Sequence, residues 1–170
     1  DSTTYTFYFQ DAIRDLNEGN PINNYQFVFS TGPVIDSLSV TGNVYKADDL
    51  NPPEETLVVL YSEPDDSAFV KHIPSYISRA DKNGYFRIDN VREQTYRLYA
   101  LKDVDNSKNY NLYDEEMAFL DSAVVVTAEK NYLPVTEDTP KVKPADPKSA
   151  DPVRMQGEYK LFLFKPPGKL

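Results

Sequence analysis

Residues 103–116, DVDNSKNYNLYDEE, carry the pattern with the clearest chemical potential in this chain. Oxygen-bearing side chains recur at nearly every second position, and several of them are acids. Calcium takes six to eight hard oxygen ligands and tolerates flexible loop geometry, so a calcium loop is one interpretation of the stretch. The candidate side-chain ligands are Asp103, Asp105, Ser107 and Asp114, with Glu116 in reserve and Asn109 offering its carbonyl oxygen.

The spacing departs from the helical calcium loop at one position. That loop has a glycine at its sixth position and an acid at its twelfth. Counting from Asp103, the twelfth residue is Asp114, but the sixth is Lys108. A residue with a β-carbon makes the sharp turn there costlier, and we expect no flanking helices. Two alternatives therefore remain open: a looser calcium loop between strands, and a solvated turn in which Asp and Asn side chains cap backbone amides.

Patterns for other chemistry are weak. The chain has one histidine, His72, and no cysteine, so it offers neither a thiol nucleophile nor a Cys/His set for zinc. It contains no Gly-x-Ser-x-Gly elbow and no glycine-rich phosphate loop. Adjacent acids such as Glu54 and Glu55 point to opposite faces of a strand or solvate a loop, whereas glycoside hydrolysis needs two facing carboxylates. We therefore expect no enzymatic activity.

The charge balance argues against nucleic acid as a partner. The chain of 170 residues has 18 basic and 27 acidic residues and a formal net charge of −9. An acidic surface repels phosphate backbones, and no basic stripe with interleaved aromatic residues is visible. No apolar run approaches the length of a membrane span.

Alternating patterns predict an all-β protein. Tyr, Phe, Val and Thr favour strands, and the chain has 13 Tyr and 9 Phe with 13 Pro. Alternating aromatic residues predict strands near residues 4–9 and 25–29, and the apolar run at 56–62 predicts a buried strand. Asn83-Gly84 predicts a hairpin turn. Further strands are expected at 85–91, at 95–102 and, as one continuous strand, across MAFLDSAVVVT.

Two segments resemble known families. The stretch TYTFYFQDAIRDLNEGNPINNYQFVFSTG resembles the last two strands of a bacterial Ig-like domain of the S-layer type. The stretches SVTGNVYKA and SRADKNGYFRIDNVREQTYRLYALKD are similar to carboxypeptidase regulatory-like and collagen-adhesin B-type domains, which are prealbumin-like (transthyretin-like) β-sandwiches. The arrangement over residues 1–130 resembles Ig-like domain-containing surface lipoproteins of Bacteroidetes, which implies an exported parent chain at the cell surface or anchored in the outer membrane.

We expect four regions. Residues 1–32 are the terminal strands of an Ig-like domain, forming an N-terminal β-hairpin, and residues 33–130 are a prealbumin-like β-sandwich. Residues 131–158 are rich in Pro, Lys, Asp and Glu, which predicts a C-terminal linker. Residues 159–170 are a strand of a following unit, or else a strand that pairs back onto the sandwich. Because the chain opens and closes on strand-like sequence, we expect it to be part of a longer protein.

These patterns support three functions. The first is a non-enzymatic structural or adhesion module of a bacterial cell-surface protein, stiffened by calcium and flanked by adjacent domains of the parent chain. The second is a module that binds a surface protein or glycan through exposed tyrosines. The third is an accessory domain of a surface enzyme. The tyrosines that could form such a platform, rather than fill sandwich edges, are Tyr76, Tyr85, Tyr96, Tyr99, Tyr110 and Tyr113.

Overall fold

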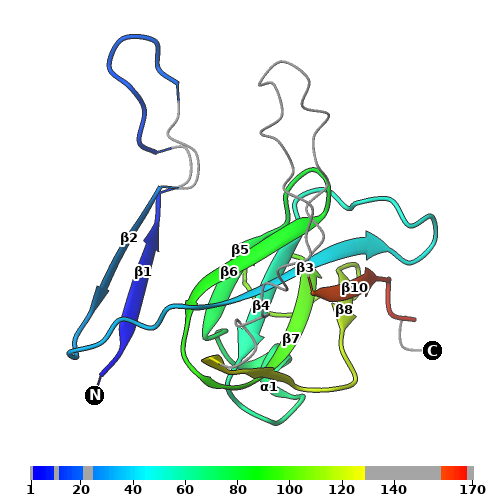
Figure 1. Ribbon diagram of the computed structural model, residues 1–170. Helices are drawn as coiled ribbons and strands as arrows, with labels where there is room; N and C mark the ends of the chain where they lie inside the picture. The colour runs from blue at the N-terminus through cyan, green and yellow to red at the C-terminus, as the bar shows by residue number, and fades with distance from the viewer. Residues whose placement is uncertain (1, 10–11, 21–24, 129–157, 168–170) are drawn as a thin grey trace, which may run out of the picture.

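The computed structural model describes residues 2–9, 12–20, 25–128 and 158–167. These residues form a β-sandwich with a separate two-stranded hairpin beside it (Figure 1). The strands are β1 (Thr4–Tyr8), β2 (Gln26–Ser30), β3 (Leu38–Lys46), β4 (Leu57–Tyr61), β5 (Tyr76–Arg79), β6 (Tyr85–Val91), β7 (Gln94–Lys102), β8 (Glu116–Phe119), β9 (Val124–Val126) and β10 (Tyr159–Leu163), with one short helix, α1 (Ala68–Lys71). The expected all-β sandwich is confirmed.

Two sheets make the sandwich. One has the strand order β10-β3-β6 and the other β5-β4-β7-β8, with β9 also paired to β7. The sequence predicted one continuous strand over residues 117–127, but the structure has two strands there, because a bend at residues 121–122 separates β8 from β9. Both short strands pair antiparallel with β7, β8 near its carboxyl end and β9 near its amino end.

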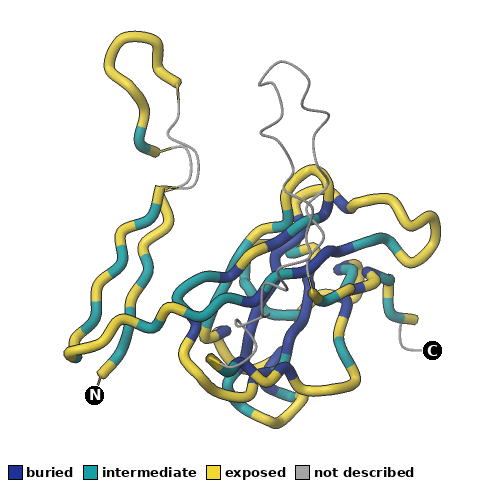
Figure 2. Tube along the Cα trace, in the orientation of Figure 1, coloured by how far each residue is buried: buried dark blue, intermediate teal, exposed yellow. Residues whose placement is uncertain are grey.

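The main core lies between the two sheets. It is built from alternate residues of facing strands, among them Val44, Leu60, Phe86, Ile88 and Leu98, which are almost fully buried. Figure 2 shows the buried stretches gathered where the sheets face one another. Burial of these apolar side chains is the dominant stabilising contribution to the fold.

A second apolar cluster covers the outer face of the sheet that contains β4 and β7. It is formed by Leu57, Val59, Tyr61, Ala68, Phe69, Tyr99 and Leu101. Strand β4 therefore has apolar neighbours on both faces, and all five of its residues are buried. This explains why its sequence, LVVLY, is continuously apolar rather than alternating.

The hairpin contacts the sandwich through its polar face. Thr4 Oγ1 accepts a hydrogen bond from the backbone N–H of Asp36 (2.9 Å), and Thr6 Oγ1 accepts one from Asn90 Nδ2 (3.3 Å). A further bond runs from the Arg92 guanidinium to the carbonyl oxygen of Ser2.

The opposite face of the hairpin is aromatic and points away from the sandwich. Its rings form a ladder in which Tyr5 and Phe29 stack at 5.3 Å between ring centres. Each ring of this face is at least one-third exposed: Tyr5, Phe7, Phe9, Tyr25, Phe27 and Phe29. We call these six residues the aromatic face.

Strand β10 lies against the sandwich rather than outside it. It pairs parallel to β3, with Tyr159 opposite Gly42 and Leu163 opposite Lys46. The sequence left two possibilities for residues 159–170: a strand of a following unit, or a strand that pairs back onto the sandwich. In the structure β10 pairs back onto the sandwich. The expected linker falls almost wholly outside the described residues, which resume at Glu158.

Candidate functional site

The loop of residues 103–115 joins β7 to β8 and packs over the second apolar cluster. The ring of Tyr110 stacks on Phe69 at 5.9 Å between centres, and Phe69 stacks in turn on Tyr99 at 4.3 Å. The backbone N–H of Tyr110 also donates to the carbonyl oxygen of Phe69 (3.1 Å). The fold of this loop therefore decides whether part of the cluster is covered.

Three carboxylates converge at the base of the loop. Asp103, Asp105 and Glu115 each offer an oxygen, and these oxygens lie within 4.8 Å of one another. Asp105 is exposed, Asp103 is partly buried and Glu115 is fully buried. The structure thus brings together two of the predicted ligands and adds Glu115, which the sequence interpretation did not select. We call these three residues the carboxylate cluster.

The two aspartates hold the turn that follows them. The carboxylate of Asp103 accepts hydrogen bonds from the backbone N–H groups of Ser107 (3.1 Å) and Lys108 (3.0 Å). That of Asp105 accepts from the Asn111 side-chain amide (3.0 Å) and from the Ser107 backbone N–H (3.0 Å). The hydrogen bonds from Asn111 and Ser107 lower the pKa of Asp105 below its ordinary value, because they favour the charged form.

Glu115 ties the end of the loop to its beginning. One carboxylate oxygen accepts from the backbone N–H of Val104 (3.1 Å), and the other from those of Asn111 and Leu112 (both 3.1 Å). A fully buried carboxylate is tolerated because three donors replace its lost hydration.

The remaining predicted ligands lie outside the carboxylate cluster. Asp114 is exposed, and Glu116 is a partly buried residue at the start of β8. The hydroxyl of Ser107 donates to the carbonyl oxygen of Asn109 (3.0 Å), so both of these predicted ligands are engaged with each other.

Lys108 occupies the place where the helical calcium loop has glycine. Its φ of 67° lies in the left-handed region, as does that of Asn106 at 63°. The loop thus makes the turn without glycine, at a conformational cost. The Lys108 ammonium donates to the carbonyl oxygen of Asn106 (3.3 Å).

This arrangement can serve two purposes. With N–H donors on every carboxylate, the loop is a self-supporting polar turn. Three carboxylates within 4.8 Å also repel one another, and a cation would offset that repulsion. Carboxylate oxygens carry more than one lone pair, so the existing hydrogen bonds leave capacity for a metal that prefers hard oxygen ligands.

The six candidate tyrosines do not lie together on one exposed face. Tyr96 and Tyr99 are buried, and Tyr76 packs edge-on against Tyr96 at 5.7 Å between ring centres. Burial raises the pKa of Tyr99 to about 12, and its hydroxyl donates to Asp66 (3.2 Å). Only Tyr113 of the six is largely exposed. Exposed aromatic side chains gather instead on the hairpin.

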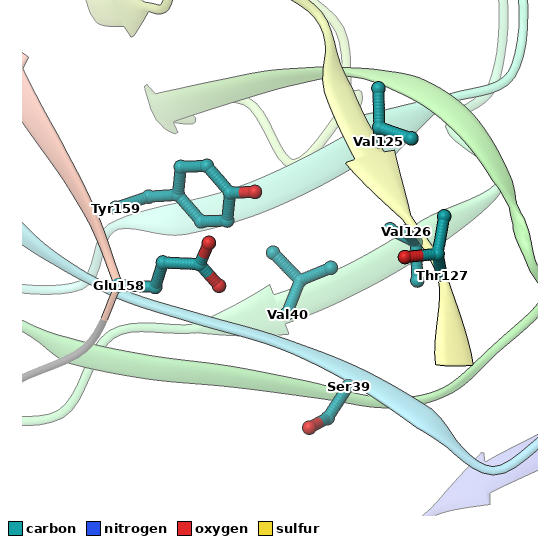
Figure 3. Close-up of a pocket in the computed structure, with 7 residues that line it drawn as sticks. All are labelled: Ser39, Val40, Val125, Val126, Thr127, Glu158 and Tyr159. Atoms are coloured by element: carbon teal, nitrogen blue, oxygen red, sulfur yellow. The ribbon is translucent and has the colours of Figure 1, made fainter. Parts of the chain in front are cut away.

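The pockets described for the molecule are small. One has a volume of about 20 Å³ and lies between β3, β9 and the start of β10, where Val40, Val126 and Tyr159 are among the lining residues (Figure 3). The other has about 130 Å³ and lies near Thr4, Asp36 and Arg92, at the junction of hairpin and sandwich. Sites for small organic ligands usually enclose several hundred Å³.

Comparison with known proteins returns no relative. No family model, no curated protein sequence and no solved structure matches this chain. Among the described residues, no helix has the length and apolar character needed to cross a membrane.

Proposed function

We propose that this chain is a non-enzymatic structural or adhesion module of a larger bacterial cell-surface protein, and that a calcium ion stiffens the loop of residues 103–115. The observation that carries the proposal is the carboxylate cluster. It joins the first residue of the loop, Asp103, to the last, Glu115. A cation bound there would fix both ends of the loop and, through Tyr110, hold the cover over the second apolar cluster.

The placement of the hairpin supports a role within a longer chain. Hairpin and β10 lie on opposite sides of the sandwich (Figure 1), as suits a unit connected in line. The aromatic face alternates with a polar face, as in strands at the inner surface of a sandwich. A two-stranded hairpin is at best marginally stable alone. From these features we infer that an adjoining sheet of the parent chain packs against the aromatic face and covers it. This agrees with the resemblance to an Ig-like domain.

The calcium component is tested by thermal unfolding of the 170-residue chain in calcium and in chelator. A ligand that binds only the native state at a hundredfold its Kd adds about 2.7 kcal/mol. For a chain of this size that corresponds to a Tm rise of about 5–10 °C. The rise should disappear in Asp103→Ala/Asp105→Ala and persist in Asp48→Asn, which removes an exposed acid outside the cluster.

Equal Tm values for the wild type in millimolar calcium and in chelator would overturn the calcium component and leave the loop as a polar turn. The module itself is tested separately, by surface labelling and protease accessibility of the parent protein on intact cells. Labelling only after lysis would contradict a cell-surface location.

Binding of a protein or glycan is a second candidate function, favoured by the aromatic face. Exposed aromatic rings supply apolar area and stack on sugars and side chains. If binding is the function, glycan or surface-protein capture by the chain should be lost in Phe7→Ser/Phe27→Ser and retained in Leu50→Ser, which alters an exposed apolar residue outside the hairpin. A structural module predicts no capture by any of the three chains.

A further inference from the structure

The cavity where the hairpin meets the sandwich contains neither the carboxylate cluster nor the aromatic face. Its volume is about 130 Å³. Thr3 and Thr4 line it from the hairpin, and the other lining residues include Asp36, ahead of β3, and Arg92 and Gln94 at the turn from β6 to β7. We call this space the junction cavity.

The lining of the junction cavity is polar throughout. Every lining residue carries a hydroxyl, amide, carboxylate or guanidinium group, so an apolar ligand would leave these groups without partners. Of the described residues that line it, only Asp36 and Arg92 are charged. Their signs are opposite, and Asp36 Oδ1 lies 3.8 Å from Arg92 Nε. The lining therefore has no net charge and favours neither a cation nor an anion.

Two side chains of the junction cavity have unused hydrogen-bonding capacity. The Asp36 side chain is only 21% exposed, yet its carboxylate accepts no hydrogen bond from the described residues, because 3.8 Å exceeds the length of one. The exposed side-chain amide of Gln94 also has no hydrogen-bond partner within the described part of the chain. A ligand that fits here must both donate and accept hydrogen bonds.

The wall beside these groups is already held in place. Arg92 donates its backbone N–H to the Tyr76 hydroxyl (3.2 Å), and its carbonyl oxygen accepts from the Tyr96 hydroxyl (3.1 Å). The two tyrosine rings meet edge-on at 5.7 Å between centres. The hydroxyls of Ser62 and Ser75 lie 3.1 Å apart. Such a preorganised wall loses little freedom when a ligand binds.

We propose that the junction cavity binds a single neutral sugar residue, such as the terminal hexose of a glycan. Each sugar hydroxyl both donates and accepts, so neighbouring hydroxyls of one ring can donate to Asp36 and accept from Arg92. The half-buried ring of Tyr76 supplies apolar area for the C–H groups of the sugar.

The size of the junction cavity suits one sugar ring. A free volume of about 130 Å³ holds about ten water molecules, which is close to the number of non-hydrogen atoms in a hexose. Because Thr3 and Thr4 belong to the hairpin, a bound sugar contacts both units. It thus reinforces the hydrogen bond from the Asp36 N–H to Thr4 Oγ1, which already joins them.

The test is an NMR titration of the 170-residue chain with glucose, galactose, mannose and N-acetylglucosamine as separate probes, in chelator. At least one sugar should give saturable shifts of the Thr4, Asp36 and Gln94 amides, with a Kd on the order of 1 mM. Shifts on both units are expected because the cavity is lined by both.

Substitutions locate the sugar. Asp36→Ala and Gln94→Ala should each weaken binding about threefold to tenfold, because each removes a hydrogen-bonding group. The matched changes Asp48→Ala and Thr95→Ala should leave the Kd unchanged, since Asp48 lies outside the cavity and Thr95 points to the other face of β7. Phe7→Ser/Phe27→Ser should also bind normally, which separates this site from the aromatic face.

The proposal is overturned if none of the four sugars gives a saturable shift at about 50 mM, well above the expected Kd. Binding that survives both Asp36→Ala and Gln94→Ala contradicts it equally. Acetate that shifts the same amides when the sugars do not would show an anion site at Arg92 instead. Because the titration is done in chelator, its result is independent of the calcium-dependent rise in Tm, and either proposal can fail alone.

Discussion

Glu115 and Glu116 are adjacent acids with different environments. Glu115 is fully buried and accepts three backbone hydrogen bonds that close the loop. Glu116 is partly buried at the start of β8 and pairs through its backbone with Lys102. Successive side chains of a strand point to opposite faces of the sheet, which accounts for the difference. Glu115 shares a face with Met117, which packs against the second apolar cluster under the loop.

We expect Glu115→Gln to lower the free energy of unfolding by about 1–3 kcal/mol. The amide keeps the shape of the side chain, but its NH₂ group opposes a backbone donor and leaves a buried N–H without an acceptor. Equilibrium denaturation in chelator measures the effect without a contribution from metal. The matched change Glu116→Gln should stay within about 0.5 kcal/mol of the wild type. Equal effects of the two changes would contradict the role given to Glu115.

The sequence allowed part of the carboxylate cluster to be predicted. Asp103 and Asp105 follow directly from their spacing in a polar stretch after a strand. Counting positions as in a helical calcium loop led to Asp114 and passed over Glu115. The alternation of Glu115 with Met117 was the available signal, but using it required knowing that a loop covers the outer face of the sheet at this point. That cover depends on Phe69, far away in the sequence.

At the level of elements, local sequence patterns predicted most of the strands. They did not identify β3 as the strand with which β10 pairs. Alternation and the Asn83-Gly84 turn indicate β6 and its neighbours, because hairpin pairing is local. Strand β10 pairs with β3 across more than one hundred residues, and a parallel pairing leaves no turn signal. The split between β8 and β9 was also missed, since the apolar run around it reads as continuous.

Gly42→Ala tests the close approach of β10 to β3. The added methyl group would lie 2.5 Å from the Tyr159 carbonyl oxygen and from the Phe86 ring, so the neighbours must shift. Overpacking of this kind costs about 1–3 kcal/mol. Hydrogen exchange should show faster exchange in β10, while amides of β4 and β7 keep most of their protection. Unchanged protection of β10 would mean that the strand accommodates the methyl group.

At the scale of the whole molecule, the hairpin and the sandwich are joined by polar contacts and have separate apolar surfaces. The bonds from Asp36, Asn90 and Arg92 reach the polar face of the hairpin. The aromatic face contributes nothing to the main core, as the exposed course of the hairpin in Figure 2 illustrates.

The double substitution Phe7→Ser/Phe27→Ser should therefore change the free energy of unfolding of the sandwich by no more than about 0.5 kcal/mol. It should also reduce the fluorescence of a dye that binds exposed apolar surface. Leu98→Ala, which empties a buried position in the main core, should cost about 2–5 kcal/mol in the same experiment. A loss from the hairpin variant as large as that from Leu98→Ala would show that the aromatic face is part of one cooperative core.

The parallel pairing of β3 and β10 has a mechanical consequence. The chain enters the sandwich at Leu38, the first residue of β3, and leaves it after Phe164, which follows β10 and forms a β-bridge with Met117. Tension applied to the flanking chain pulls these two strands in opposite directions along their shared axis. The hydrogen bonds along the five residue pairs of β3 and β10 are then strained together, in shear, instead of opening one after another from an end. A module joined in this way resists stretching at the pair of strands through which the force passes.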